Sequence, residues 1–206
     1  INDLLSDVPQ LPLRLSDLIM SSAGGNPQTI EMMVAYLIEH NVLLQAPKRW
    51  RVQLETLRKL RVPRTLQGLF GAQFGELSPE EQLLLQKAAV LGSTFPLAAL
   101  PSLDTGQPLA AAKQQAAHAS LQKAGYLLPH YATIGKPTHF RFRQATLQQV
   151  AYNSIRLVER ALYHQQAAGA LAGNRAPQPL PEAAAIAHHF ELGDQQALAA
   201  DWYAAA

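Results

Sequence analysis

The spacing of apolar residues along the chain predicts a mainly helical protein. Apolar residues recur three or four positions apart over residues 13–23 and 30–38, which places them on one face of a helix. Asn26 and Pro27 precede the second stretch and suit its N-cap and first helical position, because proline lacks an N–H that a helix start leaves unpaired. Further helices are expected after Pro63, between Ser78 and Gly92, near 97–103, and over 109–124, 157–172, 182–192 and 195–206.

Two of these helices carry sequence signals at their starts. Ser78 and Glu81 have the spacing of a capping box, in which the serine hydroxyl and the glutamate carboxylate each accept a hydrogen bond from the other's backbone N–H. Asp194 follows Gly193 between the last two helices, and it is expected to be the N-cap of the final helix.

Two short β-hairpins interrupt the helical pattern. The first is expected over 42–44 and 50–52, and the second over 126–128 and 139–143, on either side of a turn rich in proline and glycine. Phe140 and Phe142 alternate with polar residues, so both phenylalanines are expected to face the core. Three helices followed by a hairpin predict a winged-helix domain, a variant of the helix-turn-helix.

Composition narrows the classes of protein. The chain has 206 residues, 48% of them hydrophobic, without an apolar run close to eighteen residues, so no membrane span is expected. It has no cysteine, which excludes disulfides, thiolate metal sites and a cysteine nucleophile and fits a cytoplasmic protein. Ile1 begins abruptly and the sequence stops within a helical pattern, so we expect a fragment of a longer protein.

Positive charge is concentrated in one segment, although the net charge is only +2. Between positions 48 and 64 the single acid is Glu55, and the basic residues are Lys48, Arg49, Arg51, Arg58, Lys59, Arg61 and Arg64. Such a run is either a solvated linker or a contact for phosphate, nucleic acid or an acidic partner surface. Lys136, Arg141 and Arg143 in the second hairpin would add to such a contact.

The sequence lacks the common catalytic motifs. The stretch from Gly135 to Thr138 comes nearest to a P-loop, but His130 replaces the first glycine and Pro137 removes a required N–H. Neither a Gly-x-Ser-x-Gly motif nor a His-Glu-x-x-His motif is present. His188 and His189 are adjacent and therefore point about 100° apart on a helix, which indicates surface or packing roles rather than a metal site. No catalytic residue and no metal ligand is predicted.

The order of several short blocks resembles a known family. A Gly25-Asn26-Pro27 turn opens one helix; residues 140–145 read Phe-Arg-Phe-Arg-Gln-Ala and lead to Ala-Tyr at 151–152; and residues 186–190 read Ile-Ala-His-His-Phe. This order is similar to the region after the nucleotide-binding core in STAND-type signalling ATPases, which are related to AAA+ proteins. Such ATPases occur in bacterial regulators with cyclase, kinase or LuxR-type domains. Gln144 stands where that family usually has histidine.

The resemblance implies both a domain organisation and a function. Residues 1–76 would be part of a helical lid, 77–156 a winged-helix domain, and 157–206 the start of a helical-repeat region similar to tetratricopeptide repeats. Gly25, Asn26 and Pro27 would contact ATP or ADP, which the absent N-terminal core would hold together with Mg²⁺. The chain would then be a non-catalytic regulatory part of a signalling ATPase, and its repeats would bind a protein partner.

Two other functions remain open from the residues themselves. The winged helix would bind DNA in a transcriptional regulator if the helix around 116–124 offered His118, Gln122 and Lys123 to base edges, with the basic segment on phosphates. Alternatively, the terminal helices would act as a protein-interaction scaffold.

Overall fold

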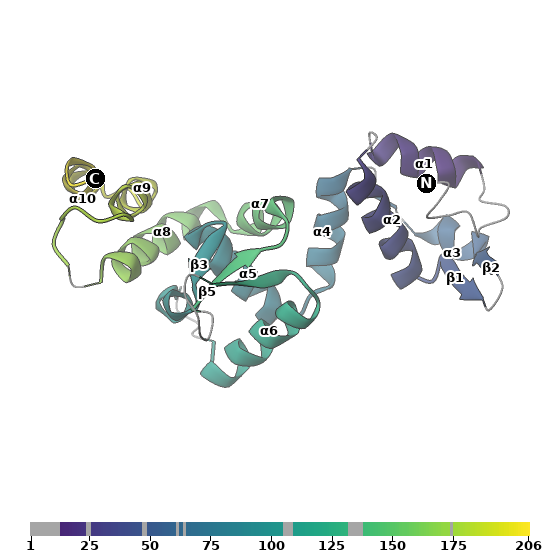
Figure 1. Ribbon diagram of the computed structural model, residues 1–206, viewed down its shortest axis with the longest axis horizontal. Coiled ribbons are helices and arrows are strands. Elements are labelled where there is room, and N and C mark those ends of the chain that lie inside the picture. Colours follow the sequence, from purple (N-terminus) through teal and green to yellow (C-terminus); the bar gives the residue numbers. More distant parts are fainter. Residues whose placement is uncertain are drawn as a thin grey trace. The chain divides into compact units, whose positions relative to one another are not determined.

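The computed structural model describes most of the chain, namely residues 13–23, 26–46, 49–60, 62–63, 65–104, 109–131, 138–173 and 175–206. Helices predominate, with two small antiparallel sheets, so the expected mainly α class is confirmed (Figure 1). The chain divides into two compact units, residues 1–73 and 74–206. The predicted division of the second unit at 156/157 stays a prediction.

The first unit combines helices with a hairpin. Its elements are α1 (Leu13–Ala23), α2 (Pro27–Glu39), β1 (Leu43–Ala46), β2 (Arg49–Val52), α3 (Leu54–Lys59) and the first part of α4 (Leu66–Glu76). The predicted hairpin is confirmed, with Leu43 opposite Val52. Leu15, Ile19 and Leu37 are fully buried and form the centre of a core that joins both helices to the hairpin.

The second unit contains a three-stranded sheet and the remaining helices. Its elements are α5 (Pro79–Leu91), β3 (Thr94–Pro96), the 3-10 helix η1 (Leu97–Ser102), α6 (Ala111–Lys123), β4 (Leu127–His130), β5 (His139–Phe142), α7 (Ala145–Ser154), α8 (Leu157–Ala172), α9 (Ala183–Leu192) and α10 (Gln196–Ala204). The strands are antiparallel in the order β3-β5-β4.

The start and end of α5 agree with their sequence signals. Ser78 Oγ accepts a hydrogen bond from the Glu81 N–H at 3.3 Å, and Glu81 Oε2 accepts one from the Ser78 N–H at 2.9 Å. Gly92 ends the helix with φ 122°, a conformation that side chains on Cβ disfavour. The predicted capping box is therefore confirmed, and it fixes where α5 begins.

The sheet is held by aromatic side chains. Phe140 and Phe142 are buried, as predicted, and Phe140 lies opposite Phe95 of β3. The rings of Phe95 and Phe142 are 6.0 Å apart, and the ring of His118 on α6 meets the Phe140 ring at 4.4 Å and 86°. The hairpin, the preceding strand and α6 therefore share one core.

The three C-terminal helices share a second core, in which Trp202 is 2% exposed. Its buried members are Ala168, Ala172, Ala183, Ile186, Ala187, Phe190, Ala199 and Trp202. The prediction that Asp194 caps α10 is wrong: Gln195 is the N-cap residue, without a side-chain hydrogen bond. Asp194 instead takes a left-handed conformation, φ 59°, in the turn before it.

Candidate functional site

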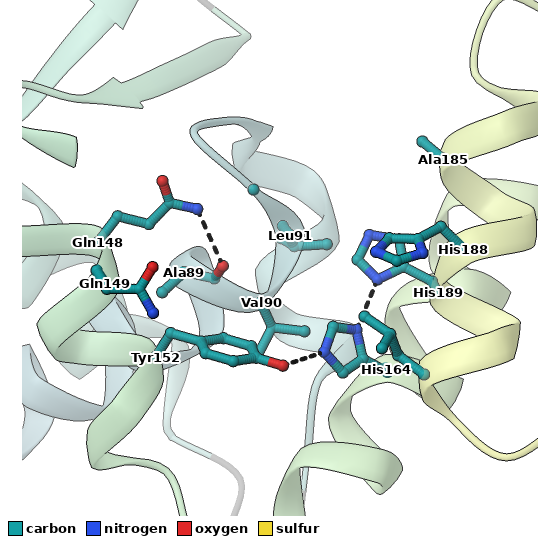
Figure 2. A pocket seen from close by; sticks show the side chains of 12 residues that line it. Ala89, Val90, Leu91, Gln148, Gln149, Tyr152, His164, Ala185, His188 and His189 are labelled. Carbon is teal, nitrogen blue, oxygen red and sulfur yellow. Dashed lines mark hydrogen bonds between the residues drawn. The ribbon is translucent and has the colours of Figure 1, made fainter. Parts of the chain in front are cut away.

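A cavity of about 450 Å³ lies in the second unit, where α5 meets α7, α8 and α9 (Figure 2). Its apolar wall comes from Ala89, Val90 and Leu91 of α5. Its polar residues come from the other three helices: Gln148, Gln149, Tyr152, His164, His188 and His189. A hollow lined by convergent polar groups at the junction of several elements is the usual starting point for a binding site.

Three side chains in this cavity form a continuous hydrogen-bonded chain. The Tyr152 hydroxyl lies 2.9 Å from His164 Nε2, and His164 Nδ1 lies 2.8 Å from His189 Nδ1. Figure 2 shows His164 between the other two side chains. We call these three hydrogen-bonded side chains the Tyr-His-His chain. Its two imidazoles are 3% and 7% exposed, so it joins α7, α8 and α9 inside the protein.

The environment of the two imidazoles favours their neutral forms. Burial lowers the pKa of His164 to about 4, with further contributions from His189, His188 and Arg160. Burial also lowers the pKa of His189 to about 4, and His188 adds to that effect. The guanidinium of Arg160, whose charge contributes to the lowered pKa of His164, lies 4.8 Å from the centre of the Tyr152 ring. Both buried histidines are therefore uncharged at neutral pH.

The two adjacent histidines of α9 point in different directions, as their spacing predicted. His189 is buried, whereas His188 is exposed and lies 3.4 Å from Glu191. Glu191 also accepts a hydrogen bond from the Tyr203 hydroxyl at 2.8 Å. The divergence of His188 and His189 on the helix agrees with their spacing, one side chain being exposed and the other buried. Sequence reasoning missed His164, because nothing near it in sequence indicates a partner 25 residues away.

Polar contacts also join α8 to its neighbours at both ends of this region. Gln166 Oε1 accepts a hydrogen bond from the Asp104 N–H at 2.7 Å, and its amide donates to the Asp104 carbonyl. Gln165 donates to the Gly193 carbonyl at 2.6 Å. A Cβ on Gly193 would lie 2.7 Å from Gln165 Cγ, so glycine permits the close approach of this turn to α8.

Replacing Gln166 by leucine is expected to destabilise the second unit by about 1–3 kcal/mol, because it leaves the Asp104 N–H and carbonyl without these partners. Hydrogen exchange of α8 amides as a function of denaturant measures the change. Gln149→Leu is the matched control, since Gln149 is exposed and its described side-chain hydrogen bond, to Asn153 at 3.3 Å, lies within its own helix. The control is expected to stay within about 0.5 kcal/mol of the parent. Equal effects of the two variants would contradict the assigned role of Gln166.

The predicted nucleotide contact lies at the start of α2. Asn26 and Pro27 are both exposed there, and Pro27 is the first residue of the helix. Gly25 lies outside the described residues.

The predicted basic contacts belong to separate units. Lys48, Arg61, Arg64 and Lys136 lie outside the described residues, and Arg49 begins β2. The others are exposed: Arg51, Arg58 and Lys59 in the first unit, and Arg141 and Arg143 in the second. Arg58 pairs with Glu55 at 2.9 Å on the same helix, which leaves less of its charge for a partner.

Neither a metal site nor a membrane span is found in the part of the chain that the structure describes. There, no three His, Cys, Asp or Glu side chains are grouped so that they could hold a metal ion. Within the same residues, no helix is both long enough and apolar enough to cross a bilayer.

Comparison with known proteins gives no match. No family model, no curated protein and no solved structure is significantly similar to this chain.

Proposed function

We propose that this chain is the regulatory part of a STAND-type signalling ATPase in the cytoplasm, and that it transmits the nucleotide state of an N-terminal core to a partner of its terminal helices. In this proposal residues 1–76 are a helical lid, 77–156 a winged helix and 157–206 the first helical repeats. ATP or ADP, with Mg²⁺, is held by the core and touched by Gly25, Asn26 and Pro27.

The observation that carries this proposal is the continuity of the second unit. Residues 74–206 form one compact body, in which the Tyr-His-His chain and the Gln166–Asp104 pair join α8 and α9 to the preceding helices. A displacement of the sheet-containing part would therefore move the terminal helices with it, which is what a mechanical relay needs. The order of elements from α5 to α7, with β3 paired to the later hairpin, supports the winged-helix assignment.

The DNA-binding alternative has less support. His118 is buried against Phe140 and is therefore turned away from any base edge. Lys113, also on α6, pairs with Glu80 at 2.8 Å. Binding of the 206-residue chain to random duplex DNA, titrated with salt, tests this alternative: tight binding that falls steeply with salt would favour the DNA reading over the relay.

The coding sequence before Ile1 provides the first test of the relay. A P-loop with Gly, four residues, Gly-Lys and Ser or Thr is expected there, because a STAND protein holds its nucleotide phosphates in that motif. The absence of such a motif from the encoded protein would contradict the proposal.

The second test measures nucleotide binding in the protein that includes this core. Pro27→Ala is expected to lower the affinity for ADP roughly tenfold, which corresponds to about 1.4 kcal/mol of lost contact. Pro101→Ala is the control, since Pro101 is an exposed proline in η1 of the other unit. The relay itself predicts that hydrogen exchange of α9 and α10 differs between the ATP and ADP states. Gln166→Leu should reduce this difference without changing the affinity for nucleotide.

A further inference from the structure

The two hydrogen bonds of the Tyr-His-His chain run in one donor-to-acceptor direction, because each neutral imidazole and the hydroxyl supply one hydrogen each. A neutral imidazole carries one N–H, so of the two facing Nδ1 atoms only one bears a hydrogen. When His164 donates from Nδ1 to His189, its Nε2 is bare and accepts the hydrogen of the Tyr152 hydroxyl. The opposite direction would leave that hydroxyl hydrogen without an acceptor among the described residues. The hydrogen-bond network therefore assigns Nδ1–H to His164 and Nε2–H to His189.

Adding a proton to the Tyr-His-His chain leaves the Tyr152 hydroxyl hydrogen without its acceptor and buries a charge. If His189 becomes protonated, both of its nitrogens carry hydrogens, so His164 must accept at Nδ1 and donate from Nε2 to the Tyr152 oxygen. The Tyr152 hydroxyl then loses His164 as its acceptor, and a positive charge is buried at His164 and His189. A second proton would place two N–H groups against each other across 2.8 Å.

The groups that face the chain do not offset that charge. Arg160 on α8 adds a cation over the Tyr152 ring, and the neighbouring His188 on α9 further disfavours the charged forms of His164 and His189. Glu191, on the same helix as His188, contacts that exposed histidine. From α5 the cavity receives apolar side chains, among them Val90 and Leu91.

We propose that Tyr152, His164 and His189 form a proton-operated latch, which holds α9 against α7 and α8 when neutral and loosens that contact when one proton is taken up. The latch follows from the contacts of the second unit alone and does not depend on a nucleotide core. Loss of the relay would therefore leave the latch unaffected. Loss of the latch would leave the upstream P-loop test and the ADP affinity of the Pro27 variant unchanged, because neither involves the second unit.

Proton linkage gives the expected change of the α9 opening equilibrium with pH. The pKa of each buried imidazole is about 4 in the closed contact, and that of a free histidine is about 6.5. The open state therefore binds the proton more tightly, and the closed state is favoured above pH ~6.5 and weakened as the pH falls toward ~4. Each imidazole that titrates on opening is expected to raise the opening equilibrium constant roughly twenty-fold between pH 7 and pH 5, so twenty-fold is the smallest response that the latch predicts.

Two measurements on the intact chain test the latch, both with EDTA present so that no metal bridges the imidazoles. The first is a nitrogen-15 NMR titration of the imidazoles. At pH 7 it should show two neutral rings, with the hydrogen of His164 on Nδ1 and that of His189 on Nε2. The second is hydrogen exchange of the α9 amides at pH 7 and pH 5, corrected for the intrinsic effect of pH on exchange. The opening equilibrium constant in α9 should rise by at least the twenty-fold factor given above.

Histidine variants distinguish the pH response of the latch in α9 from a general destabilisation of the protein by acid. His164→Gln combined with His189→Gln removes both titrating groups, and the response of α9 should fall below about threefold. His130→Gln removes an exposed histidine on β4 and should leave the full response. If the double variant fails to fold, the tautomers and the His130→Gln comparison still decide. Any other pair of tautomers at pH 7, α9 exchange that does not change with pH, or an unchanged response in a folded double variant would each overturn the latch.

Discussion

Alanine in place of Trp202 is expected to destabilise the terminal helices by about 3–5 kcal/mol, because the indole fills the centre of a core built mostly from small side chains. Trp202 is 2% exposed and lies in a core with five buried alanines from α8, α9 and α10, together with Ile186 and Phe190. Alanines have no rotamers that could extend into the space left by an indole, so the cavity would stay open. Hydrogen exchange of α9 and α10 amides measures the loss in this part of the molecule.

The next residue in the chain supplies the control for this substitution. Tyr203 is 46% exposed, and its described polar contact is the hydroxyl bond to Glu191. Tyr203→Ala removes an aromatic side chain of similar size and is expected to cost less than about 1 kcal/mol. If the two alanine variants had the same effect, Trp202 would not be the centre of this core.

Features that depend on a few residues adjacent in sequence, such as helix starts and strand alternation, could be predicted from the sequence. Ser78 and Glu81 predicted the start of α5, and Pro27 predicted the start of α2, because a cap depends on a few residues and their own backbone. The alternation around Phe140 likewise predicted β5 and the two buried phenylalanines. These elements could be located without knowledge of the rest of the fold.

Features that depend on distant residues were not accessible in the same way. β3 spans only Thr94–Pro96 and ends in proline, so it has no visible alternation and exists because Phe95 lies opposite Phe140. α3 has only six residues, and although Leu57 packs against the core of the first unit, a helix this short shows too little of a repeat to be detected. The turn at Asp194 has the residue type of a cap but a left-handed backbone, which residue type alone does not show.

The candidate site illustrates the same limit. His188 and His189 were visible as a pair, and their divergence on a helix was predictable from helix geometry. The contact of His189 with His164 required knowledge of how α8 and α9 pack, including the close approach at Gly193. Polar residues that serve a buried interface look like ordinary surface residues until their partners are known.

Phe95→Ala is expected to cost the second unit about 3–5 kcal/mol of stability, the other large effect that the structure implies. Phe95 is fully buried, its ring lies 6.0 Å from that of Phe142, and its strand pairs with β5 through Phe140. Loss of the ring would leave a cavity between the sheet and its helices and would weaken the pairing of β3 with β5. Denaturant-dependent hydrogen exchange of the β5 amides measures this, since the Phe142 N–H donates to the Ser93 carbonyl at 3.1 Å.

Two further variants provide smaller expected losses of stability with which Phe95→Ala can be compared. Phe95→Leu retains most of the buried volume and is expected to lose about 1.5 kcal/mol or less. Thr94→Ala alters the exposed neighbour on the same strand and is expected to change stability by about 0.5 kcal/mol. The ranking Ala, Leu, then Thr94→Ala follows from the volume removed from the core. If Phe95→Ala were instead as stable as Thr94→Ala, β3 would not be part of the core that holds the sheet, and the support that its pairing gives to the winged-helix assignment would be lost.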